Sequence, residues 1–169
     1  GTVGGEGFVD GEVSNVRATG SVTTVAQGKV TNTVTFDEGA AFKADNYEIS
    51  KTEGELYIVD QGIADTSVDT PSNQMYDGAE HKYIPVVTSA EGAVLVEGTD
   101  YDVSYSTTDY TNVTGKITVT ITGKGNYSGT VTREYEITKR PVTLTSEGGY
   151  KTYDGSPLTK PTVTVGGEG

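Results

Sequence analysis

Apolar and polar residues alternate in two neighbouring segments of the chain. Between positions 116 and 122 the apolar residues Ile117, Val119 and Ile121 are separated by threonines. Between 130 and 138 the apolar side chains again fall on one face. A period of two predicts half-buried β-strands. The Gly-Lys-Gly-Asn sequence that separates the two segments favours a turn, so we expect a hairpin.

Weaker strand signals occur on both sides of this hairpin. Residues 100–106 place two tyrosines and a valine on one face, and residues 141–144 are expected to begin a new strand. Residues 30–36 show the same alternation, although Asn32 interrupts the apolar face. Residues 65–73 are polar and predict only a weak strand or a linker.

The composition favours strands over helices throughout. The 169 residues include 28 Thr, 21 Val and 11 Tyr, and these β-branched and aromatic residues favour a pleated, half-buried surface. The 23 Gly and five Pro residues interrupt any long helix. We therefore predict an all-β fold of tandem small Ig-like β-sandwich modules without significant helix. β-Grasp-like modules are the alternative.

Three short sequences occur twice, which indicates related units. The duplicated sequences are Tyr-Asp-Gly at 76–78 and 153–155, Asn-Tyr at 46–47 and 126–127, and Thr-Val-Gly-Gly-Glu-Gly at 2–7 and 164–169. A unit that begins near Tyr-Asp-Gly and ends on the strand after Asn-Tyr is complete only in residues 61–139. Residues 1–60 then form the carboxyl-terminal part of a second kind of module, and residues 140–169 form its amino-terminal part.

These residues resemble a family of bacterial surface modules. The resemblance is carried by the Tyr-Asp-Gly turn at 76–78, the Val-Glu-Gly-Thr-Asp-Tyr segment at 96–101 and the Gly-Lys-Gly-Asn-Tyr segment at 123–127. The pattern is similar to the YDG and MBG repeat domains of large surface proteins of Gram-positive bacteria. By this resemblance, residues 61–139 are an MBG/Ig-like module, while 1–60 and 140–169 are the two parts of a YDG-type module.

The resemblance implies a structural stalk of a bacterial adhesin, located outside the cell and attached to the cell wall. The alternative is a carbohydrate- or mucin-binding module in its own right, with a host glycan or protein as partner. Tyr110 and Tyr127 are the possible ligand contacts, because they are expected in loops and an aromatic ring can stack on a sugar. We also expect head-to-tail self-association, in which the two parts of the YDG-type module pair between molecules.

Several function classes are disfavoured. The chain has no Cys and one His, which argues against disulfides, zinc sites and Cys or His catalysis, and we expect no catalytic, cofactor-binding or metal-binding residue. A net charge of −12 disfavours nucleic acid as a partner. No apolar run approaches the roughly 20 residues that cross a bilayer, so no membrane insertion is expected.

Three groups of residues have a chemical interpretation and a simpler structural one. The acidic segment 60–69 is the best calcium candidate, but a solvated acidic face is the favoured interpretation. Lys–Asn isopeptide bonds are conceivable for Lys116 with Asn112 and for Lys29 with Asn32, but solvated lysines are favoured. The single histidine, at position 81, is expected to be exposed.

Overall fold

The computed structural model describes residues 2–167 and confirms an all-β fold. Its only helical elements within this range are the 3₁₀ turns η1 (Val25–Gln27), η2 (Ala44–Asn46) and η3 (Ile63–Asp65). No helix in the described part of the chain is long and apolar enough to span a membrane. The sandwich arrangement of the strands stays a prediction.

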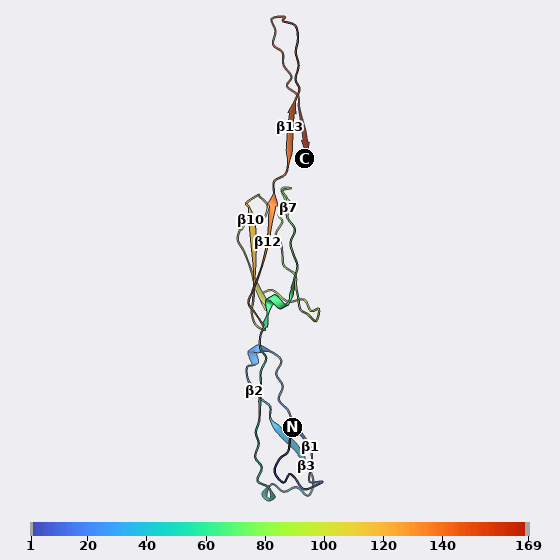
Figure 1. The fold of residues 1–169 in the computed structure, drawn as a ribbon, viewed down its shortest axis with the longest axis vertical. Helices are drawn as coiled ribbons and strands as arrows, with labels where there is room; N and C mark the ends of the chain where they lie inside the picture. Colours follow the sequence, from blue (N-terminus) through green and yellow to red (C-terminus); the bar gives the residue numbers. More distant parts are fainter. Residues whose placement is uncertain (1, 168–169) are drawn as a thin grey trace.

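Three parts of the chain lie in line along one long axis (Figure 1). Residues 2–60, here called the amino-terminal part, form one end of the molecule. Residues 61–139, the central unit, lie in the middle, and residues 140–167, the terminal hairpin, form the other end. The two parts of the expected YDG-type module are therefore separated by the whole central unit.

The central unit is built on a four-stranded sheet. Its order is β7 (Gln74–Met75), β12 (Thr130–Thr138), β10 (Lys116–Gly123) and β9 (Tyr101–Tyr105). β10 and β12 pair antiparallel over seven positions, from Lys116 opposite Glu136 to Thr122 opposite Thr130. This confirms the hairpin that the alternating pattern predicts.

Short strands complete the central unit. β6 (Ser67–Val68) pairs antiparallel with β8 (Val87–Thr88), which confirms a strand within the polar segment 65–73. Two further pairs are parallel: β5 (Gln61–Gly62) with β11 (Tyr127–Ser128), and β7 with β12. Parallel partners join segments that lie far apart in the sequence, so the beginning of the unit is bonded to its end.

Every buried hydrophobic side chain among residues 2–167 belongs to the central unit. One cluster lies between the β6–β8 pair and the sheet, and a second lies on β10 and β12 toward the other end. Ile117, Val119 and Ile121 of β10 are fully buried, while the threonines between them are not. The expected inward face of this strand is thus confirmed. The members of the core are Ile63, Val68, Val87, Leu95, Tyr101, Ile117, Val119, Ile121, Tyr135 and Ile137.

The amino-terminal part has two short strand pairs and no fully buried side chain. β1 (Val13–Ala18) pairs with β3 (Val34–Glu38), and β2 (Val30–Thr31) pairs with β4 (Glu55–Leu56). Asn32 lies in the break between β2 and β3, and its side-chain oxygen accepts a hydrogen bond from the Gly20 amide at 3.0 Å. At the far end the rings of Phe8, Phe36, Phe42 and Tyr47 form a cluster, with centroids 5.1–6.2 Å apart.

The terminal hairpin consists of β13 (Val142–Ser146) and β14 (Val163–Gly167), which pair antiparallel. β13 confirms the strand expected after Arg140–Pro141. All ten residues of the two strands are exposed. A loop connects the strands and carries the second Tyr-Asp-Gly sequence at the tip of the molecule (Figure 1).

Both joints between the parts are held by hydrogen bonds. At the first joint the side chain of Asn126 accepts from the Val25 amide at 2.9 Å, and its main-chain carbonyl accepts from the Gln61 amide at 2.9 Å. At the second joint Arg140 donates to the Tyr76 carbonyl at 3.3 Å. Asn126 therefore connects the amino-terminal part to the central unit.

Candidate functional site

Tyr110 lies in a loop of the central unit, as expected, but its ring is half-buried. Its hydroxyl donates to the Thr107 carbonyl at 3.0 Å, and its ring packs edge-on against Tyr105, with centroids 5.3 Å apart. The Lys82 ammonium lies 4.7 Å from the Tyr105 centroid and 5.2 Å from that of Tyr110. The two rings and the ammonium form a cation–π cluster on the edge of the sheet.

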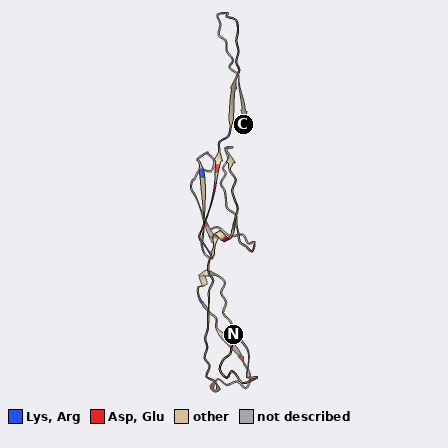
Figure 2. Ribbon diagram, in the orientation of Figure 1, with Lys and Arg blue, Asp and Glu red and all other residues tan. Residues whose placement is uncertain are grey.

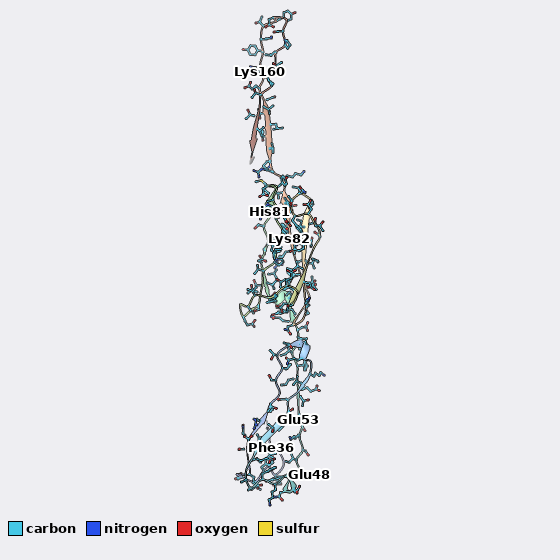
Figure 3. The ribbon with its side chains drawn as sticks, turned by 180° about the vertical axis from the view of Figure 1, so that it is seen from behind. Phe36, Glu48, Glu53, His81, Lys82 and Lys160 are labelled. Atoms are coloured by element: carbon cyan, nitrogen blue, oxygen red, sulfur yellow. The ribbon has the colours of Figure 1, made fainter. Side chains whose placement is uncertain are left out.

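Tyr127, the second candidate, is not part of this cluster. It was expected in a loop, but the structure places it in β11. It pairs with Gln61 at the first joint, and its half-buried ring packs against the core cluster around Ile63. Tyr110 instead contacts Lys82, which Figure 3 places toward the terminal hairpin. The structure does not bring the two candidate tyrosines into one site.

The duplicated Tyr-Asp-Gly sequences form the same turn. In each copy the aspartate carboxylate accepts the amide hydrogen two residues ahead, at 2.9 Å, and the glycine has a positive φ, 79° at Gly78 and 74° at Gly155. In the central unit His81 Nε2 also lies 2.6 Å from Asp77 Oδ1. The His81 side chain is only 22% exposed, so the prediction of an exposed histidine is wrong. The only local indication of this contact in the sequence is that His81 follows Asp77 by four residues.

These bonds lower the pKa of both aspartates. For Asp77 the main cause is the hydrogen bond from the Ala79 amide, followed by that from His81. For Asp154 the Lys151 ammonium, 2.8 Å from Oδ1, lowers the pKa to about 2, and Ser156 adds to the effect. Both carboxylates thus stabilise their turns in the charged form.

A hydrogen-bonded group that sequence reasoning missed closes the central unit near β6. Tyr83 donates its hydroxyl to Asp69 Oδ1 at 2.6 Å, and the Val86 amide donates to the same oxygen at 2.8 Å. Arg133 lies on the inward face of β12 and donates to the carbonyls of Val68 and Asp69. The group joins three elements into one structural unit: β6, β12 and the segment that precedes β8.

The buried tyrosines of this unit make its stability sensitive to alkali. Burial raises the pKa of Tyr83, Tyr101 and Tyr135, and it raises that of Tyr105 to about 12. Because the folded state holds the neutral phenol, this stabilisation is complete below the ordinary pKa of about 10 and is lost as the pH rises toward 12. We expect the free energy of unfolding from urea titrations to fall between pH 10 and 12, and to fall less in Tyr105→Phe. A flat profile over this range would contradict the assignment.

Asp69 of the acidic segment considered for calcium, and Asp100 and Asp102 outside that segment, each have a separate partner. Asp69 accepts from Tyr83, Asp100 accepts the Val96 amide at 2.8 Å, and Asp102 lies 3.1 Å from the Lys124 ammonium. Among residues 2–167 no three acidic or histidine side chains are placed to hold a metal ion. Acidic and basic positions are spread along the molecule (Figure 2).

The four residues considered for isopeptide bonds have other partners. Lys116 lies 3.4 Å from Glu134, and Lys29 lies 3.6 Å from Glu55; both lysines are exposed. The Asn112 side chain donates to Asp109 at 2.9 Å, and the Asn32 side chain binds the Gly20 amide. The structure pairs neither lysine with its candidate asparagine.

A concave surface lies in the amino-terminal part. It is a groove of about 780 Å³, here called the aromatic groove. One wall is the duplicated segment 2–7, and the other walls are β1, β3 and residues 46–52. Phe8, Phe36 and Tyr47 contribute rings to its lining. Figure 3 shows Phe36 in this part, at the opposite end of the molecule from Lys160 of the terminal hairpin. The groove thus brings three aromatic rings together at one end of the rod, beside polar residues that include Arg17 and Lys51.

Comparison with known proteins identifies no relative. The chain matches no family model, no curated protein and no solved structure.

Proposed function

We propose that this chain is a stalk segment of a bacterial surface adhesin, built from YDG- and MBG-type modules and exposed outside the cell wall, with no enzymatic activity. One observation carries the proposal: the three parts follow one another along a single axis, with both joints hydrogen-bonded (Figure 1). A protein that spaces a binding region from a surface needs this arrangement, because unbonded joints would let the parts fold back on one another.

The shared turn geometry supports the relation between the modules. The Tyr-Asp-Gly turns at 76–78 and 153–155 use the same aspartate-to-amide bond and the same positive-φ glycine. In both copies the turn stands between two short antiparallel strands, β6 with β8 and β13 with β14. Repeated units of one design, joined in line, are typical of extended arrays.

The stalk function is tested by the height at which the chain presents a tag. The protein carries an antibody epitope before residue 1 and is anchored through residue 169 to beads at low surface density. A polymer brush on the same beads surrounds the anchored molecules. A Gly/Ser linker of equal length is the control, and its reach grows only as about 5–6 Å times the square root of the residue number. At a brush height that hides the epitope on the linker from the antibody, we expect the epitope on this protein still to bind the antibody. Equal capture by both would contradict the proposal.

The same beads test the carbohydrate-binding alternative. A stalk is expected to show no specific binding on an array of mucin-type glycans. Specific binding that is lost in Tyr110→Ala or Tyr127→Ala would favour a glycan-binding module over a spacer. Because both rings also pack within the central unit, circular dichroism is required to show that each variant remains folded.

A further inference from the structure

The terminal hairpin has an apolar face that nothing within residues 2–167 covers. Leu144 stands opposite Val165, and Val142 and Val163 lie on the same face of the pair. These four side chains are 52–69% exposed. The threonines of both strands lie on the other face, as the pleat requires. A two-stranded hairpin with one exposed apolar face is marginal in water unless that face is packed.

The corresponding strands of the central unit show how such a face is buried. β6 and β8 also flank a Tyr-Asp-Gly turn, and there Val68 and Val87 stand opposite each other. These two valines are only 9% and 0% exposed, because they pack against the sheet that contains Ile121. The terminal hairpin has the corresponding strands and turn, but no sheet among residues 2–167 packs against them.

We propose that the aromatic groove of a second copy of this chain receives β13, which leaves β14 and pairs there with residues 2–5 of that copy. Within one chain the groove and the hairpin lie at opposite ends (Figure 1). The wall of the groove is the segment 2–7, whose sequence is identical to that of 164–169. β13 therefore meets the same strand sequence in the neighbour that it meets in its own hairpin.

The register of the pairing follows from the hairpin itself. Leu144 stands opposite Val165, so in the neighbour it stands opposite Val3. At Gly167 an added Cβ would lie 2.5 Å from the Pro141 carbonyl, whereas at the equivalent Gly5 nothing lies within 4 Å. The backbone beside Gly5 is thus open at the place that Pro141 fills beside Gly167.

Residues 2–5 of the neighbour have the same sequence as the residues of β14 that they replace, so the free energy of the strand pairing itself changes little. The gain comes from packing Val142 and Leu144 of β13 against the groove. Electrostatic repulsion between the two copies is small. Residues 140–169 carry three basic and three acidic residues, so the net charge of −12 comes from the rest of the chain. The contact joins two different surfaces, so it propagates head to tail into linear chains.

Engineered cysteines test the pairing directly, because the chain has none of its own. In the double variant Leu144→Cys/Val3→Cys we expect mild oxidation to give a ladder of disulfide-linked multimers. The matched control is Leu144→Cys/Gly4→Cys, in which the second cysteine is shifted by one residue and faces the opposite side of the strand. A ladder of equal intensity in both variants, or monomer in both, would overturn the proposal.

Removal of residues 164–169 gives a second, independent readout. It takes away the strand that competes for β13, so sedimentation velocity is expected to show association at a several-fold lower protein concentration. Weaker association would show that β14 itself is required and would overturn the exchange. Thermal unfolding of the central unit serves as the folding control. The inference does not rest on the stalk function, since the bead test uses isolated, tethered molecules and can fail separately.

Discussion

Replacing Ile121 by alanine is expected to lower the free energy of unfolding of the central unit by about 2–5 kcal/mol. The Ile121 side chain is fully buried and lies in the cluster between the β6–β8 pair and the sheet. Its strand pairs on both sides, with Val103 of β9 and Val131 of β12 opposite this position. The surrounding strands cannot close over the missing atoms, so a cavity adds to the lost burial.

This loss is measured by urea unfolding and by the melting temperature. In a unit of this size the melting temperature is expected to fall by on the order of 10 °C or more. The control is Val94→Ala in the same unit, where the side chain is 67% exposed and the expected change is within about 0.5 kcal/mol. Equal effects of the two substitutions would show that the core is not centred on Ile121.

Replacing Gly123 by alanine is expected to destabilise the central unit by about 1–3 kcal/mol and to loosen the first joint. A Cβ at Gly123 would lie 2.7 Å from the Ser128 amide nitrogen and 2.9 Å from the Tyr127 carbonyl carbon. Both atoms belong to the backbone of β11 and cannot rotate away. β11 must therefore move, and with it the bond from the Gln61 amide to Asn126.

Two measurements separate these effects from a general glycine effect. Urea unfolding gives the loss of stability, and hydrogen exchange at the Gln61 amide reports the joint. Gly54→Ala is the matched control, because nothing lies within 4 Å of its added Cβ. Unchanged exchange at Gln61 in Gly123→Ala would show that the close approach of β10 and β11 does not hold the joint.

Local patterns predict the elements of this fold better than its long-range pairings. The alternation around Ile117 predicts β10, β12 and their turn, because both strands bury one face and the turn between them is short. The parallel pairing of β7 with β12 leaves no such trace, since Gln74 and Ile137 are far apart in the sequence. Nothing in the neighbourhood of either residue indicates the other.

Polar residues at candidate sites show the same limit. Asn126 is readily interpreted as a turn residue, yet its side chain also binds the Val25 amide across the first joint. Arg133 falls on the inward face of β12, where the apolar neighbours on that face argue against a charged side chain. The carbonyls of Val68 and Asp69 accept its hydrogen bonds there. Such partners are known only once the tertiary arrangement is known.

The two parallel strand pairs determine how the central unit bears tension. The chain enters through β5 at one end and leaves through β12 at the other (Figure 1). β5 is bonded to β11 and β7 to β12, each in parallel register. Pulling on the two ends therefore slides these strands along one another, so the hydrogen bonds of each pair are strained together instead of opening one after another. A stalk of the kind proposed above is loaded in this direction.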